Sequence, residues 1–181
     1  EQWGTVNWTT MNAAFRACEN LNISATDVPN LSAVTDMDSM FDECSSLNSP
    51  ANINSWDTSN IKIMVGMFSA ATSFNQPIGD WNTSNVTDMD SMFLTAHSFN
   101  QNIGSWNVSA VTSFTNFMNS KTAANFSATN LDAIYNGWSS RAVKPSITIT
   151  FGTAKYTAAS SAGRAILTGS PNLWTITDGG I

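Results

Sequence analysis

The stretch SFNQPIGDWNTSNVTDMDSMF begins at Ser73, and the closely similar stretch SFNQNIGSWNVSAVTSFTNFM begins at Ser98. The two are 25 residues apart, and Trp81 and Trp106 take the same place in each. Five segments align on this pattern without gaps, with steps of 26, 27, 25 and 25 residues between their first residues. A fixed period of this length predicts repeats that stack on one another rather than a globule. The segments begin at Trp8, Val34, Ile61, Val86 and Val111.

Each repeat contains an apolar pattern that indicates a short helix. In the copy that begins at Val86, apolar residues follow at Met89, Met92 and Phe93, on what would be one helical face. Asp88 then falls in the first turn, where an acidic side chain caps free amides.

A large apolar residue that follows each helix by about six residues indicates a short strand. The last two candidates have the clearest strand chemistry, because threonines alternate with apolar residues around Ile149 and Ile176. Carrying the period through the chain gives seven strand centres, at Leu21, Leu47, Phe74, Phe99, Phe126, Ile149 and Ile176.

These patterns predict an α/β repeat fold, a solenoid of about seven coils with short parallel strands on one face and short helices on the other. One domain would span residues 1–181, with regular repeats of 25–27 residues over 1–120 and degenerate repeats and a cap over 121–181. Helices are expected in the segments NLDAIYNGW and YTAASSAGRAILTG, the second ended by Gly169. Stacked positions would form an aromatic column of Trp56, Trp81, Trp106 and Tyr156.

Composition excludes two classes of partner. Lys and Arg number 7 against 13 Asp and Glu, so the chain has no basic surface for nucleic acid. No apolar run approaches the ~20 residues that span a bilayer, so we expect no membrane insertion. Asn, Ser and Thr are abundant in place of charge, which is typical of extracellular proteins.

The motif around the tryptophans resembles a known repeat family. Its pattern, MF-x-x-A-x-SFNQ-x-IG-x-W-(N/D)-x-S-x-V-T-x-M, is similar to the 26-residue repeat of bacterial surface proteins, a relative of the BspA-like leucine-rich repeats. Residues 8–119 carry the resemblance, and YTAASSAGRAILTG followed by WTITDGG is similar to the closing segment of such arrays. The resemblance implies a right-handed leucine-rich-repeat-like solenoid, a secreted or surface-exposed setting in bacteria or their phages, and no enzymatic activity.

Cys18 and Cys44 occupy the same position in adjacent repeats, where Ala71 and Ala96 stand in the next two. A position that accepts alanine favours a pair of buried free thiols. The spacing between neighbouring coils is also within reach of a disulfide, so a Cys18–Cys44 bond is the second possibility.

No group in the sequence indicates catalysis, a cofactor or a metal. His97, the one histidine, aligns with polar residues of the other repeats and is expected to face solvent. The acidic pairs of the two TDMDS segments could suggest calcium, but two carboxylates fall short of the six or more oxygen ligands of a calcium site. We therefore expect neither an enzyme nor a metal protein.

Short uncharged polar residues flank the expected strand centres and predict a ligand-binding face. One of their two columns could instead be structural, with Asn22, Asn48, Asn75 and Asn100 turned inward to bind loop amides. The predicted face consists of Ser46, Asn48, Ser73, Asn75, Ser98, Asn100, Ser127, Thr148, Thr150, Thr175 and Thr177.

These features favour a non-catalytic recognition or adhesion module on a bacterial cell or phage surface. It would bind a cell-surface glycan or protein receptor and form part of a larger polypeptide. Two alternatives remain: a structural spacer within a surface protein or phage fibre, and an ice-binding protein, suggested by the Thr-Ile-Thr triplets at 148–150 and 175–177.

Overall fold

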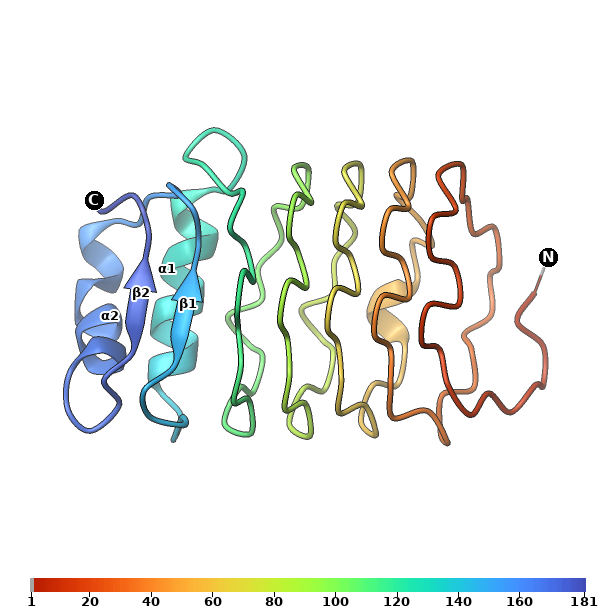
Figure 1. Cartoon of the computed structure of the whole chain (residues 1–181), viewed down its shortest axis with the longest axis horizontal. Coiled ribbons are helices and arrows are strands. Elements are labelled where there is room, and N and C mark those ends of the chain that lie inside the picture. The colour runs from red at the N-terminus through yellow and green to blue at the C-terminus, as the bar shows by residue number, and fades with distance from the viewer. Residues whose placement is uncertain (1) are drawn as a thin grey trace.

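Successive stretches of the chain lie side by side along the long axis of the molecule, with the two termini at opposite ends (Figure 1). The computed structural model describes residues 2–181. Over this range the regular elements are few and mostly C-terminal. They are the 3-10 helices η1 (Ile53–Ser55) and η2 (Ala158–Ser160), the α-helices α1 (Ala128–Ser139) and α2 (Ser161–Thr168), and the strands β1 (Thr148–Thr150) and β2 (Thr175–Thr177).

Each repeat is joined to the next by backbone hydrogen bonds between equivalent positions. The amide of Met37 donates to the carbonyl of Ile63 (3.0 Å), and the amide of Met64 donates to that of Asp88 (3.0 Å). Isolated parallel bridges continue this pairing, from Asp36 to Ile63, Ile63 to Asp88 and Asp88 to Ser113. Equivalent positions of neighbouring repeats are therefore in contact, as the period predicts.

The predicted fold class is wrong, because the expected helix and strand do not form in each repeat. Within residues 2–181 there are two α-helices and one two-stranded sheet, not seven coils of the α/β kind. In the segments expected to be helical, amides that donate to the neighbouring repeat alternate with amides that donate three residues back, as in single turns, so no continuous helix forms. The same position of all five repeats also has a positive φ of 52–57°, and a left-handed residue interrupts an α-helix. These residues are Ala13, Ser39, Gly66, Ser91 and Asn116.

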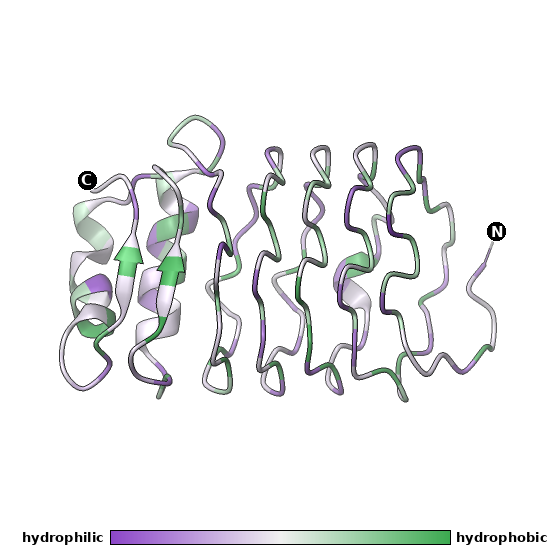
Figure 2. Ribbon diagram, in the orientation of Figure 1, coloured by the Kyte–Doolittle hydropathy of each residue, from purple (hydrophilic) through white to green (hydrophobic). Residues whose placement is uncertain are grey.

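The strand prediction holds at its last two centres only. β1 and β2 pair in parallel, with Ile149 opposite Ile176, and both isoleucines appear as green centres of their strands in Figure 2. The five earlier centres lie outside regular strands. Phe114, not Phe126, bridges to Ile149, so the sheet continues the row of segments that were expected to be helical.

Both helices of the C-terminal part form where the sequence predicts them. Ser127 caps α1 by accepting the amide of Asn130 (3.2 Å), and α2 is followed by Gly169. Leu131, Ile134, Tyr135 and Trp138 make the buried stripe of α1. α1 packs closely on the preceding repeat, since a Cβ on Gly137 would lie 2.0 Å from the carbonyl oxygen of Gly104.

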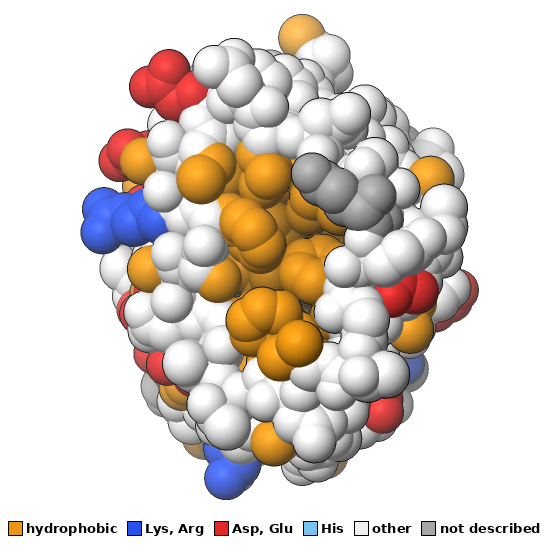
Figure 3. All heavy atoms as spheres, turned by 90° about the vertical axis from the view of Figure 1, so that its right-hand side faces the viewer, with side chains coloured by type: hydrophobic (Ala, Val, Ile, Leu, Met, Phe, Trp, Pro, Cys, Tyr) orange, Lys and Arg blue, Asp and Glu red, His pale blue; other side chains and the backbone are white. Residues whose placement is uncertain are grey.

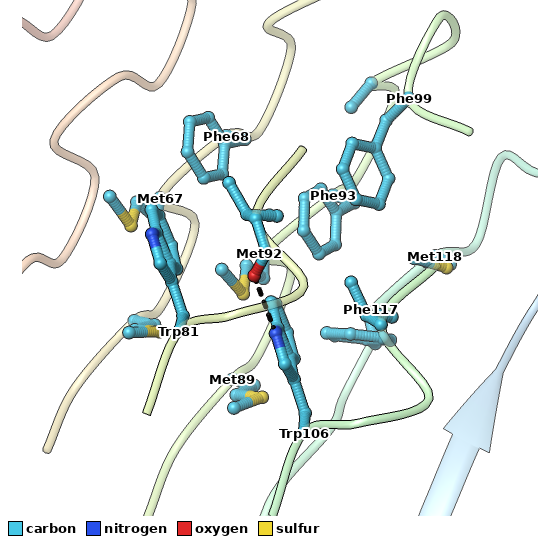
Figure 4. Close-up of a cluster of buried hydrophobic side chains, with 14 of the residues drawn as sticks. Met67, Phe68, Trp81, Met89, Met92, Phe93, Phe99, Trp106, Phe117 and Met118 are labelled. Carbon is cyan, nitrogen blue, oxygen red and sulfur yellow. Dashed lines mark hydrogen bonds between the residues drawn. The ribbon is translucent and has the colours of Figure 1, made fainter. Parts of the chain in front are cut away.

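Aromatic rings stack along the core (Figure 4). The ring centroids of Phe41 and Phe68 are 5.6 Å apart, and those of Phe68 and Phe93 are 5.8 Å apart. Tyr156 does not extend the tryptophan column as expected, because its ring lies against Tyr135. Trp138 takes that place: its Nε1 donates to the carbonyl of Ile103 (3.1 Å), one repeat after the equivalent bond of Trp106 to Ile78 (2.9 Å).

Candidate functional site

The two strands present threonines to solvent. Their parallel register sets Thr148 beside Thr175 and Thr150 beside Thr177. Ile149 between them is buried, whereas Thr148, Thr175 and Thr177 are exposed. Alternation along the strands therefore produces a small array of hydroxyl groups in register.

This array continues through the regular repeats. The bridge from Phe114 to Ile149 aligns Ser113 and Thr115 with the two threonines of β1, which gives a third rung of hydroxyl groups. Ser113 is bridged to Asp88, Asp88 to Ile63, and Ile63 to Asp36, so the same row of positions extends toward the N-terminus. We call this surface the polar face. Its members are Asp36, Asp38, Asp88, Asp90, Ser113, Thr115, Thr148, Thr150, Thr175 and Thr177.

Carboxylates of the polar face are held in place by backbone amides. The Asp88 carboxylate accepts the amide of Asp90 (3.0 Å), and the Asp36 carboxylate accepts that of Asp38 (2.8 Å). Asp90 accepts the hydroxyl of Ser113 and the amide of Thr115 (2.6 Å). These three carboxylates keep a fixed orientation because the amides that they bind belong to the paired backbone.

Like charges gather in the N-terminal half of the polar face. Partial burial raises the pKa of the Asp88 carboxyl above its usual range, and the carboxylates of Asp90 and Asp38 raise it further. The hydrogen bond from the Asp90 amide lowers this pKa but does not cancel the rise. Ile63 and Val65, both half-buried, separate the two acidic pairs. A ligand of this half would have to offer hydrogen-bond donors or positive charge.

The predicted serine and asparagine residues lie elsewhere. Ser46, Ser73 and Ser98 are exposed in the turns that follow the paired segments. The threonines of β1 and β2 are not aligned with these serines, because Ile149 is bridged to Phe114, which lies within a paired segment and not in a turn. The structure thus divides the eleven predicted residues into two groups.

The asparagine column is structural from Asn48 onward. Asn48 Oδ1 accepts the amide of Asn75 (2.9 Å), and Asn75 Oδ1 accepts that of Asn100 (2.8 Å). Asn100 Oδ1 in turn accepts the amide of Ser127 (2.9 Å), the residue that caps α1. These side chains join repeats to each other and are not free for a ligand.

A family model described as "Mycoplasma protein of unknown function, DUF285" matches residues 3–144, which is most of the chain. The chain belongs to this family. The DUF285 match includes the polar face from Asp36 to Thr115 and ends before β1. Among curated proteins and among solved structures, no match to the chain was found.

Aspartates of the polar face were missed as surface groups because their segments were expected to be helical. The alternation of Ser113, Phe114 and Thr115 is the same signal that identified β1 and could have revealed the extended backbone. In this DUF285 chain the same alternation occurs around Met37 and Met89, but there aspartate flanks the apolar residue, and aspartate is rare in strands.

The two cysteines are free thiols in different surroundings. Cys18 is exposed, whereas Cys44 is buried and its thiol donates to the carbonyl of Phe15 (3.0 Å). The structure therefore contains neither the Cys18–Cys44 disulfide nor a pair of buried thiols. Burial raises the pKa of the Cys44 thiol to about 11, which makes it a poor nucleophile at neutral pH.

Other candidate chemistry is sparse in the DUF285 chain. His97 is exposed. Over residues 2–181, no cluster of three or more His, Cys, Asp or Glu side chains could hold a metal ion. No helix in that range has the length and apolar character needed to cross a membrane.

Proposed function

We propose that this DUF285 chain is a non-catalytic recognition module, located on the outside of a bacterium, that binds a glycan or protein receptor along the polar face. The observation that carries this proposal is the row of hydroxyl and carboxylate groups held in register from Asp88 to Thr177, with the pair of Asp36 and Asp38 beyond Ile63. The resemblance of the repeats to bacterial surface proteins of the BspA-like kind supports the extracellular setting.

A row of this type suits recognition for a physical reason. Neighbouring rungs repeat at a spacing of about 4.8 Å, so an extended ligand can meet several hydrogen-bonding groups in succession. The backbone beneath is already ordered by bonds between repeats, such as that from Met89 to Ser113 (3.1 Å). Binding therefore loses little conformational entropy in the protein.

Binding to the intact chain should be tested with a glycan array and with pull-downs from candidate host cells. A variant carrying Ser113→Ala, Thr150→Val and Thr177→Val removes three hydroxyls from the polar face. The matched control carries Ser46→Ala and Ser98→Ala, in the turns away from this face. We expect the first variant to lose the captured partner and the control to retain it.

The proposal fails if no specific glycan or protein is captured, or if the polar-face variant binds as well as the wild-type chain. A partner lost only in the control would move the site to the serine turns. Both variants replace exposed or half-buried side chains, so circular dichroism should show the wild-type fold for each.

Ice binding is the second candidate, favoured by the third hydroxyl rung. Ser113 and Thr115 extend the array of β1 and β2 to three neighbouring rungs of the same spacing. A measurable thermal hysteresis that disappears with Thr150→Val and Thr177→Val would support this function. No thermal hysteresis from the wild-type chain would exclude it.

A further inference from the structure

The N-terminal end of the molecule presents a row of free backbone carbonyls. In the second repeat the carbonyls of Asp36, Asp38, Met40 and Asp42 accept amides of the first repeat at 2.8–3.1 Å. The equivalent carbonyls of the first repeat have no donor within the described residues. They belong to Thr10, Asn12, Ala14 and Arg16. This edge therefore offers mainly acceptors, with the amide of Thr9 as a donor beside them, since the equivalent amide of Lys62 donates to the preceding repeat.

The C-terminal end offers the complementary groups. The amides of Thr175 and Phe151 make bonds of 2.8 Å between β1 and β2, so the alternation of a parallel pair turns the amide of Ile176 away from β1. The amide of Asp178, two residues on, also has no acceptor among residues 2–181. Arg164 covers part of this edge by donating to the carbonyl of Ile176 (3.3 Å). The outer edge of β2 thus presents the amides of Ile176 and Asp178 as donors, and the carbonyl of Ile176 between them is bound by Arg164.

These donors and acceptors are in register with each other. Ile176 is paired with Ile149, which is bridged to Phe114, so these residues occupy the same position in successive repeats. At the equivalent position of the second repeat, the amide of Met37 donates to a carbonyl of the next repeat. Thr10 takes the accepting position of that pair in the first repeat. Placing β2 of one molecule against the first repeat of another would continue the ladder, from Ile176 to Thr10 and from Asp178 to Asn12.

Apolar side chains are concentrated at the same two ends. Seen from the N-terminal end, an apolar patch fills the centre of the surface (Figure 3). Half-buried Trp3, Phe15 and Leu21 line a pocket there. Large apolar side chains that are more than two-fifths exposed occur, over residues 2–181, in the first repeat and in the C-terminal segment. They are Val6, Val28, Ile166, Leu173 and Ile181.

Charge also differs between the two halves of the chain. Residues 1–90 contain eleven of the thirteen acidic residues and two of the seven basic ones. Residues 91–181 contain the other two acidic residues and the other five basic ones. Opposite ends therefore attract each other, whereas two N-terminal ends would repel.

We propose that the chain associates head to tail with a second copy, the C-terminal face of one molecule resting on the N-terminal face of the next. Two N-terminal faces fit each other poorly, because both would bring mainly carbonyls and negative charge to the contact. A head-to-tail contact is heterologous and leaves one face of each kind open, so it produces linear chains of molecules. The polar face stays exposed in such a chain, and the association does not depend on the proposed function.

Two variants block one face each while replacing only exposed side chains. The N-face variant carries Val6→Lys and Val28→Lys, and the C-face variant carries Ile166→Lys and Leu173→Asn. Asparagine suits position 173 because its φ is +55°. Thr87→Lys, at an exposed site between the ends, is the matched control.

Sedimentation velocity over a concentration series up to about 1 mM gives the readout. We expect wild-type and Thr87→Lys proteins to form dimers and longer species as concentration rises. Each face variant alone should lose at least about tenfold in association constant. An equimolar mixture of the two variants should form dimers and nothing longer, because one intact face of each kind remains.

Three results would overturn the proposal. One is a wild-type chain that stays monomeric throughout the series. Another is a C-face variant that self-associates as strongly as the wild-type chain, which would mean contact between two N-terminal faces. The third is a mixture of the two variants that shows no more association than either alone.

Discussion

The indole rings of Trp81 and Trp106 lie parallel, with an interplanar angle of 3° and centroids 6.4 Å apart. Each Nε1 donates to an isoleucine carbonyl of the preceding repeat, Ile53 for Trp81 (2.8 Å) and Ile78 for Trp106 (2.9 Å). The dashed line in Figure 4 marks the second of these bonds. The tryptophans therefore contribute both stacking area and a buried polar link between repeats.

Replacing Trp106 by phenylalanine should lower the free energy of unfolding by more than the loss of buried apolar area explains. The change keeps an aromatic ring but removes the indole donor from the buried carbonyl of Ile78, which then keeps only the Trp81 amide (3.3 Å). We expect this to cost about 0.5–1.5 kcal/mol in addition to the lost contacts. Urea denaturation followed by circular dichroism measures the change in the free energy of unfolding. Trp56→Phe is the matched control, because Trp56 Nε1 has no acceptor among residues 2–181. Equal destabilisation by both substitutions would contradict a role for the hydrogen bond.

The asparagine column should be sensitive to substitution where the neighbouring serine column is not. Asn75→Ala removes the acceptor of the Asn100 amide (2.8 Å) and of Gln101 Nε2 (2.9 Å), so we expect a loss of about 1–3 kcal/mol. Ser73→Ala, at an exposed side chain two residues earlier, should change stability by less than about 0.5 kcal/mol. Thermal and urea unfolding of both variants test this difference.

Lys121 should make stability depend on pH. Its ammonium group is buried, donates to the carbonyls of Ala96 and Phe99 (2.7 Å for Phe99), and lies near the Phe99 and Phe126 rings. Burial lowers its pKa to about 7, well below the unfolded value, so the unfolded chain binds more protons between about pH 7 and 10. The free energy of unfolding should therefore increase from pH 7 to pH 9.

The control for this prediction is Lys121→Met, which removes the titrating group. Its free energy of unfolding should not increase over the same interval, and should fall slightly toward pH 9 as the unfolded Cys44 thiol ionises. The interval stops at pH 9 because burial raises the pKa values of Cys44 and Tyr135. Their unfolded forms, with ordinary pKa values of about 8.5 and 10, lose protons as the pH rises and increasingly favour unfolding. A wild-type stability that falls from pH 7 to pH 9 would contradict the assignment.

The two thiols should react at very different rates. Cys18 is exposed and should be alkylated by iodoacetamide within minutes in the native protein, whereas buried Cys44 should react only after unfolding. Mass spectrometry of the native reaction should show one modification per chain, and Cys18→Ala should abolish it. Rapid labelling of both thiols would show that the first repeats open readily.

The sequence predicts which residues become neighbours better than it predicts their conformation. The period correctly places Trp81 on Trp106 and Asn48 beside Asn75, because those contacts depend only on equal spacing. The spacing of Val86, Met89, Met92 and Phe93 is compatible with a helix, but the same residues are buried in an extended segment with left-handed turns. Apolar spacing alone does not distinguish these two backbones.

The candidate site was predicted in part for the same reason. The threonines of β1 and β2 were placed on a surface because their alternation is a local signal. Asp88 and Asp90 could be added only when the bridge from Asp88 to Ser113 was known. Trp138 was missed as a member of the tryptophan column because the chain between Trp106 and α1 departs from the regular period.

The equal spacing of Val86 and Val111 has a consequence for how such genes can change. Deleting residues 86–110 would join Asn85 directly to Val111. Each remaining residue would then contact the equivalent position of a neighbouring repeat, as it does now. Duplication of the same 25 residues would be equally compatible. A recombination event that adds or removes anything other than whole repeats shifts tryptophans, asparagines and the left-handed positions out of alignment together.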